Sequence, residues 1–194
     1  SGKWTAVQKK KIISSRVEST KLLQNAFNTA TKRPEIFVSA SAIGYYGSVT
    51  SNHVFTEEDV AGDDFLAETV VKWENSVKKI HQLVNQTAML KIVLLMSKKG
   101  GALPKMLLPV KLGVGSAIGT GKQWVPWIAL DDLARLFLFV LEEKLSKTAS
   151  RDLLIYNAVS PNEITNKELM RQLAKAINRP FFMPSIPALF FKGL

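Results

Sequence analysis

The sequence contains no cysteine and only two histidines, His53 and His81, among its 194 residues. Without cysteine the chain cannot form a disulfide bond, a thiolate zinc site or a cysteine nucleophile. Two histidines also disfavour a histidine-built metal centre, so we predict that the protein holds no metal. The lack of cysteine fits a reducing compartment, and we expect a cytoplasmic location.

Long apolar runs are missing as well, because none reaches the roughly 18 residues that a membrane-spanning helix needs. No signal-peptide pattern opens the sequence. We therefore expect no membrane partner. Hydrophobic residues make up 46% of the chain and charged residues 22%, which is ordinary for a globular protein. The length is sufficient for one domain with a substantial core.

Acidic residues are in the minority, since 16 Asp and Glu stand against 26 Lys and Arg, giving a formal net charge of +10. Such an excess of positive charge is typical of proteins with anionic partners, including nucleic acids. The densest lysine clusters are Lys9–Lys11, Lys78–Lys79 and Lys98–Lys99. They are dispersed and not interleaved with stacking aromatic residues. We therefore disfavour a nucleic-acid partner and expect a solvated basic surface.

Apolar residues at steps of three and four alternate with short apolar runs along the chain. The steps predict amphipathic helices, and the runs predict buried strands. In chain order the expected elements are a helix around 13–27, a strand at 35–40, a helix around 70–84, a strand at 91–95, a helix with Asp131 as its N-cap, a strand at 153–157 and a helix opened by the capping box Thr165–Glu168. This alternation predicts an α/β fold with a parallel sheet and right-handed crossovers.

The segment Ser39–Gly47 carries two serines and two tyrosines directly after an apolar run. Ligands of open parallel sheets bind beyond the carboxyl ends of the strands, so we place the candidate site at this turn. Ser39 and Ser41 would hydrogen-bond a carbonyl or hydroxyl group of a substrate, or they would cap the strand. Tyr45 and Tyr46 would act as acids or line a pocket, or they would be packed tyrosines with hydroxyls at the surface.

Two motifs of dinucleotide enzymes are absent. No tyrosine is followed four residues later by a lysine, the spacing with which short-chain reductases activate a phenol. The glycine-rich run Gly113–Gly121 leads into Gln123–Trp127 rather than into a helix, so it lacks the context of a phosphate-binding fingerprint. We expect this run to be a flexible loop near the substrate.

Acidic residues near the expected helix starts are interpreted first as partners of the helix dipole. They are Asp63, Asp64, Glu68, Asp131 and Asp132. His81 lies one position beyond the apolar stripe of its helix, and we expect it in solvent.

A set of short motifs extends along nearly the whole chain, and its most specific elements are Gly-Tyr-Tyr-Gly and Gln-Trp-x-x-Trp-Ile. The segments are Gly2–Thr5, Ser14–Thr20, Ser39–Gly47, Gly62–Glu68, Trp73–Glu74, Gly100–Leu103, Lys111–Gly115, Gly121–Trp124, Trp127–Ile128, Asp131–Leu133, Asn157–Ala158 and Thr165–Glu168. Together these motifs resemble the epimerase-like branch of the extended short-chain dehydrogenase/reductase superfamily, in particular its "epimerase family" related to nucleotide-sugar epimerases.

This chain differs from the family's pattern in three ways. Family members begin with a Gly-x-x-Gly-x-x-Gly turn and continue past Leu194, so we expect the N-terminal dinucleotide-fingerprint unit and the C-terminal end to be lacking here. Where the family has an Arg-Thr-Gly turn after the strand that ends at Leu95, this chain has Met96–Lys99. The family's catalytic tyrosine and lysine match Leu66 and Val70, which cannot transfer protons.

The resemblance implies a doubly wound, Rossmann-like parallel sheet in a single domain over residues 1–194, with a substrate-side portion at about 98–127 and 158–194. It implies a nicotinamide dinucleotide, NADP rather than NAD, and epimerase or oxidoreductase chemistry on a small, nucleotide-sugar-like substrate. A non-catalytic NAD(P)-binding or redox-sensing protein is the alternative, and oligomerisation is left open.

Site residues follow from these expectations. We assign catalytic roles to Ser41, Tyr45 and Tyr46, with Ser41 matching the active-site serine of the superfamily. Cofactor-binding roles go to Ser39, Ala40 and Arg16. Substrate-side roles go to Gly101, Lys105, Gln123 and Trp124.

Overall fold

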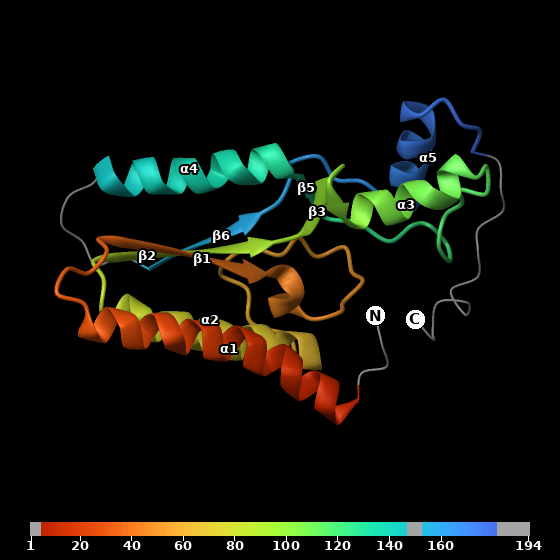
Figure 1. Ribbon diagram of the computed structural model, residues 1–194. Helices are drawn as coiled ribbons and strands as arrows, with labels where there is room; N and C mark the ends of the chain where they lie inside the picture. The colour runs from red at the N-terminus through yellow and green to blue at the C-terminus, as the bar shows by residue number, and fades with distance from the viewer. Residues whose placement is uncertain (1–4, 147–152, 182–194) are drawn as a thin grey trace. The chain divides into compact units, whose positions relative to one another are not determined.

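The computed structural model describes residues 5–146 and 153–181 (Figure 1). Their contacts divide them into two compact units. The larger unit takes its described residues from Trp4–Ile92 and Leu133–Ala158, and the smaller unit from Val93–Asp132 and Val159–Leu194. Each unit has its own three-stranded sheet.

The larger unit is built on a parallel sheet with the strand order β1-β2-β6. The strands are β1 (Ile36–Ala42), β2 (Gln86–Ile92) and β6 (Leu153–Ala158). Helices α1 (Ala6–Thr29) and α2 (Phe65–His81) cover one face of this sheet, and α4 (Leu130–Ser146) runs along the other (Figure 1). The predicted α/β fold with a parallel sheet is confirmed, with helices on both faces.

Local sequence signals explain where the helices of this unit begin and end. The Thr5 side chain accepts the Gln8 N–H at the start of α1, and the chain leaves that helix before Arg33-Pro34. Asp64 caps α2 by accepting the Ala67 N–H, as a helix start with this residue predicts.

The strands of the larger unit are longer than the sequence predicts. Strand β1 continues beyond residue 40 through Ser41 to Ala42, so Ser41 lies in the strand and not in the predicted turn. Strand β2 begins at Gln86, five residues before the predicted start, and ends at Ile92. Its first two residues, Gln86 and Thr87, are polar but buried, so apolarity alone misses them.

The smaller unit contains β3 (Leu94–Ser97), β4 (Gly100–Gly101), β5 (Trp127–Ala129), α3 (Ala102–Lys111) and α5 (Asn166–Ala176). Strand β3 pairs antiparallel with β4 and parallel with β5. Its core brings Val110 of α3 against Met170 and Ala174 of α5. The Thr165 hydroxyl accepts the Glu168 N–H, which confirms the predicted start of α5.

Three further predictions are wrong in detail. The apolar run at 91–95 is not one strand, because it breaks at Val93 between β2 and β3. Helix α4 begins at Leu130, so Asp131 and Asp132 both lie in its first turn and Asp131 is not the N-cap. His81 is partly buried, and its Nδ1 is a buried atom without a hydrogen-bond partner in the described structure.

No helix among the described residues is long and apolar enough to cross a membrane.

Candidate functional site

Polar side chains line up where the three parallel strands of the larger unit end. The register pairs Ser41 of β1 with Lys91 of β2, and Lys91 with Asn157 of β6. Each of the three residues is the last but one of its strand. Paired residues of neighbouring strands point to the same face of a sheet. The carboxyl edge therefore carries a hydroxyl, an ammonium and an amide in one row.

The row faces α2, where it meets a buried carboxylate. The Ser41 hydroxyl donates to Glu74 Oε1 at 2.5 Å, and Lys91 Nζ lies 3.8 Å from the same oxygen. Ser41, Glu74 and Lys91 are 3%, 3% and 1% exposed. Burial lowers the pKa of Lys91, and the nearby Glu74 carboxylate opposes that shift. The site therefore contains a desolvated ion pair, Lys91 with Glu74, whose carboxylate also accepts a hydrogen bond from Ser41.

The Lys91 ammonium also contacts the tyrosines of the short 3-10 helix η1 (Ile43–Tyr46). Its Nζ lies 3.8 Å from the ring centroid of Tyr45 and 5.4 Å from that of Tyr46. Both distances are within the range of a cation–π contact. Tyr45 is partly buried, and its hydroxyl makes no hydrogen bond within the described part of the chain. A ligand at the strand ends could therefore use this phenol.

Unlike Tyr45, Tyr46 has its hydroxyl hydrogen-bonded within the protein. That hydroxyl lies 2.8 Å from Asn157 Oδ1 and 2.9 Å from the Thr56 carbonyl oxygen, both of which accept from it. Burial raises the pKa of Tyr46 to about 12. A phenol that keeps its proton this strongly suits a structural hydrogen bond better than general base catalysis near neutral pH.

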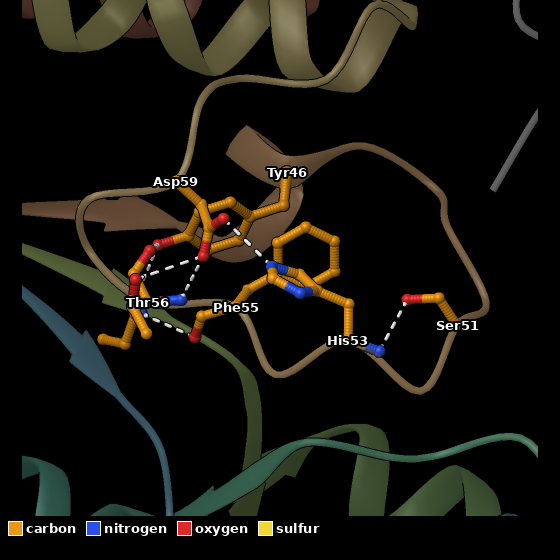
Figure 2. Close-up of polar contacts among 7 residues, drawn as sticks. Tyr46, Ser51, His53, Phe55, Thr56 and Asp59 are labelled. Carbon is orange, nitrogen blue, oxygen red and sulfur yellow. Dashed lines mark hydrogen bonds and ion pairs between the residues drawn. The ribbon is translucent and has the colours of Figure 1, made fainter.

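A covering loop, residues 48–61, packs over Tyr46 (Figure 2). Phe55 stacks on the Tyr46 ring at 4.9 Å, and His53 meets Phe55 edge-on at 4.7 Å. Asp59 accepts the Thr56 N–H at 2.7 Å and lies 2.9 Å from His53 Nε2. Hydrogen bonds from the Thr56 backbone and from His53 lower the pKa of Asp59. The loop is therefore an ordered cover and not a loose connection.

The two ends of the covering loop meet beside η1. The Gly62 N–H donates to the Tyr45 carbonyl at 2.9 Å, and the Ser48 N–H donates to Asp64 Oδ2 at 2.8 Å. Gly47 has a φ of +81°, which favours glycine. A Cβ on Gly62 would lie only 2.7 Å from the Tyr46 carbonyl oxygen. Such closely spaced ends are typical of an Ω-loop.

The structure brings the three residues predicted as catalytic into one cluster but gives them different surroundings. Among the described residues the Tyr45 hydroxyl has no hydrogen-bond partner, whereas the hydroxyls of Ser41 and Tyr46 are engaged within the protein. Of the residues predicted to bind the cofactor, Ser39 shares the face of Ser41 and donates to the Ala40 carbonyl, while the Ala40 side chain points to the other face.

Arg16, the third residue predicted to bind the cofactor, lies on α1. Its guanidinium is 5.6 Å from the ring centroid of Trp73 and donates to the Ile12 carbonyl at 3.0 Å. The Trp73 contact joins α1 to α2, the Ile12 contact lies within α1, and neither involves the strand ends.

The residues predicted on the substrate side all belong to the smaller unit. Gly101 precedes α3 with a φ of +78°, and Lys105 lies within α3. Gln123 donates from Nε2 to the Ile118 carbonyl at 3.0 Å. Trp124 is 48% exposed and forms an isolated β-bridge with Thr165.

Lys91, Glu74 and Asn157 were not predicted as site residues. One signal was available for Lys91, because a lysine interrupts the apolar run Met89–Val93. A strand buried on both faces has no solvated position for such a charge, so it must have a partner. The partner, Glu74, is 17 residues earlier on α2 and could be found only with the fold in hand.

Comparisons with known proteins agree with this fold. No protein-family model matches the chain. The Bacillus subtilis epimerase family protein YfhF is 32% identical over 97% of this chain, and the Arabidopsis thaliana homologue of SDR39U1, named as chloroplastic, is 33% identical over 100% of it. The chain spans 60% and 54% of the length of these relatives.

Solved structures extend the comparison. The human epimerase family protein SDR39U1, solved with NADPH, superposes with a TM-score of 0.80 at 30% identity, covering 95% of this chain and 59% of that one. A nucleoside-diphosphate sugar epimerase from Corynebacterium glutamicum gives a TM-score of 0.74 at 31% identity, covering 91% and 36%. The chain is therefore homologous to the epimerase family proteins, and its structural neighbours include one of these proteins solved with NADPH and a nucleoside-diphosphate sugar epimerase.

Proposed function

We propose that the protein carries out NAD(P)-dependent epimerase or oxidoreductase chemistry on a small substrate with hydroxyl groups, in particular a nucleotide sugar. The observation that carries this proposal is the row of Ser41, Lys91 and Asn157 at the carboxyl ends of three parallel strands, with the Tyr45 phenol beside it. Ligands of such sheets bind at this edge. NADPH in the structure of the human relative supports NADP as the cofactor.

The described residues fit one end of a nicotinamide dinucleotide better than the other. The hydroxyl groups of Ser39 and Tyr45 near the strand ends suit the nicotinamide and its ribose. The start of α2 is occupied by the Asp64 carboxylate, and α5 carries Glu168 in its first turn. Carboxylates at helix N-termini repel the pyrophosphate that such positions otherwise bind. Ser39 and Ala40 are therefore proposed to lie near the nicotinamide, and we propose no phosphate contact beyond Arg16.

The substrate-side residues Gly101, Lys105, Gln123 and Trp124 keep their proposed roles within the smaller unit. Lysine, amide and indole groups are suited to the phosphates, hydroxyls and base of a nucleotide sugar. The cytoplasmic location also stays a prediction, because the Arabidopsis relative is named as chloroplastic.

A non-catalytic NAD(P)-binding or redox-sensing protein is the second candidate. It is favoured by the Ser41 hydroxyl, which is buried and donates to Glu74 instead of facing a ligand. It is also favoured by the apolar residues Leu66 and Val70 at the positions of the family's tyrosine and lysine.

Cofactor binding and turnover separate the two candidates. The full-length protein would be titrated with NADPH and NADH, followed by absorbance at the reduced nicotinamide band, and then offered a panel of nucleotide sugars. We expect tighter binding of NADPH and turnover with at least one sugar. Binding without turnover across the panel would favour the sensor, and no binding of either nucleotide would reject both candidates.

The basic composition allows a direct test of nucleic-acid binding as well. A specific binder of DNA or RNA shows an affinity that falls steeply with salt concentration. We expect no measurable affinity for either at about 150 mM salt. Tight, salt-dependent binding would contradict the enzyme proposal.

A further inference from the structure

Helix α2 presents apolar side chains where the resemblance expects a tyrosine and a lysine. Leu66 and Val70 pack against Gly44 of η1, since a Cβ built on Gly44 would lie 3.6 Å from atoms of both residues. Val70 is 5% exposed. Because Gly44 directly precedes Tyr45, these apolar residues support the segment that holds the phenol. Helix α2 itself has no proton donor at this place.

Lys91 brings a positive charge to the same place from a different element. Its ammonium is 3.8 Å from the Tyr45 ring centroid and is almost completely buried. The charged groups that influence it are the Glu74 carboxylate, the more distant Glu57 carboxylate of the covering loop, and Lys78. Screening by water is weak in such a setting, so charges act on one another more strongly than at the surface.

We propose that Tyr45 and Lys91 form the proton-transfer pair of this site, with Tyr45 as the catalytic residue that contacts substrate and Lys91 as its positioning residue. The inference rests on the proposed function. Tyr45 is suited to the contact because it is partly exposed and its hydroxyl has no partner among the described residues. Lys91 cannot reach a substrate itself, because it is 1% exposed.

The proposed step is the oxidation of a substrate carbinol. The C–H bond of a substrate carbinol breaks, and its hydride passes to the oxidised nicotinamide dinucleotide, which is thereby reduced. The O–H bond of the same carbinol breaks, and its proton passes to the phenolate oxygen of Tyr45. The substrate becomes a carbonyl compound. In the reverse step the hydride and the proton return to it. The Lys91 ammonium offsets the negative charge of the phenolate until the proton arrives.

A purely structural role for Lys91, as the counter-ion of Glu74, is the competing explanation. A double variant separates the two roles. Lys91→Met with Glu74→Gln removes both charges together, so neither partner is left as an unpaired buried charge, and the new amide oxygen still accepts the Ser41 hydroxyl. Lys72→Met is the matched control, because Lys72 is 48% exposed and pairs with Glu68 on the surface of α2.

Nitration by tetranitromethane tests the pair without any substrate, because this reagent attacks the phenolate form of tyrosine. The chain contains three tyrosines, so tandem mass spectrometry can follow Tyr45 by itself. We expect Tyr45 nitration to be about tenfold slower in the double variant than in the wild type, because the ring loses its contact with a buried cation. The Lys72→Met protein should match the wild type. Equal rates in all three proteins would overturn the role of Lys91.

Turnover then connects the pair to the reaction. If the full-length protein turns over a nucleotide sugar, the double variant should need a higher pH to reach half of its maximal rate. If nitration of Tyr45 is slower in the double variant but no nucleotide sugar is turned over, the effect of Lys91 on Tyr45 stands and the proposed function is rejected. Turnover with an unchanged pH profile and unchanged nitration would keep the function and reject the pair.

Discussion

Lys91 is the residue on which the candidate site depends, because a charge buried in a parallel sheet is stable only with partners. Glu74 supplies the opposite charge at 3.8 Å, and the tyrosine rings of η1 cover the ammonium. The desolvation of both ions nevertheless offsets much of their attraction. Such a pair contributes little net stability, which fits a role in function rather than in folding.

A thermodynamic cycle tests this description of the ion pair. Lys91→Met alone leaves the Glu74 carboxylate buried without its counter-ion, and we expect a loss of about 3–5 kcal/mol in the free energy of unfolding. Lys91→Met with Glu74→Gln should recover most of that loss. Urea denaturation of the wild type and the variants measures both values. A double variant as unstable as the single one would contradict the description.

Tyr46 leads to a prediction about alkaline pH. Its pKa is raised from 10.0 to about 12 in the folded protein, so the unfolded chain releases the phenol proton first as the pH increases. The contribution of Tyr46 to stability is therefore complete below pH 10 and is lost as the pH rises towards 12.

Tyr46→Phe isolates this effect from the titration of other groups. The difference in unfolding free energy between wild type and variant should shrink between pH 10 and pH 12, and at neutral pH the variant should be less stable by about 1–3 kcal/mol. The loss at neutral pH follows because the carbonyl of Thr56 and the amide of Asn157 lose their donor. A difference that stays constant with pH would show that Tyr46 ionises as in the unfolded chain.

At the scale of elements, the covering loop depends on the close approach of its two ends. A Cβ on Gly62 would lie 2.7 Å from the Tyr46 carbonyl oxygen and 2.9 Å from the Gly47 backbone, so this backbone must move. We expect Gly62→Ala to destabilise the protein by about 1–3 kcal/mol.

Gly100→Ala is the control for this change, because a Cβ at Gly100 meets nothing within 4 Å. We expect its effect on thermal unfolding to be small. Limited proteolysis should also cut the covering loop faster in Gly62→Ala than in Gly100→Ala. Equal melting temperatures for the two variants would mean that the loop ends tolerate a side chain.

The order and type of the elements in the larger unit could be predicted from periodicity, because apolar stripes and capping residues act locally. The start of β2 at Gln86 could not, since its buried polar residues are stabilised by neighbours in the sheet and not by their own apolarity. The smaller unit has short strands and a glycine-rich segment, and its pairing depends on contacts distant in sequence.

The candidate site could be predicted in part for the same reason. The serines and tyrosines after the first apolar run are adjacent in sequence and were visible as a group. The partnership of Tyr45 with Lys91 joins residues 46 positions apart, and it exists only because β1 and β2 lie side by side in the sheet.

At the scale of the whole molecule, the chain corresponds to 54–60% of the length of its curated relatives, and its described residues contain the strand ends but no fingerprint for the pyrophosphate. Under the proposed function, the described residues supply the proton-transfer group but not the main phosphate contacts. This division predicts that changes at Tyr45 affect the chemical step more than the affinity for the nucleotide.

The comparison of Tyr45→Phe with wild type in the full-length protein tests this account most directly. The substitution keeps the ring that faces Lys91 and removes only the hydroxyl. We expect NADPH affinity to stay within about twofold, while turnover of a nucleotide sugar falls by about 10²-fold or more, as for the loss of a general acid or base. Turnover that survives Tyr45→Phe undiminished would contradict the assignment of the site.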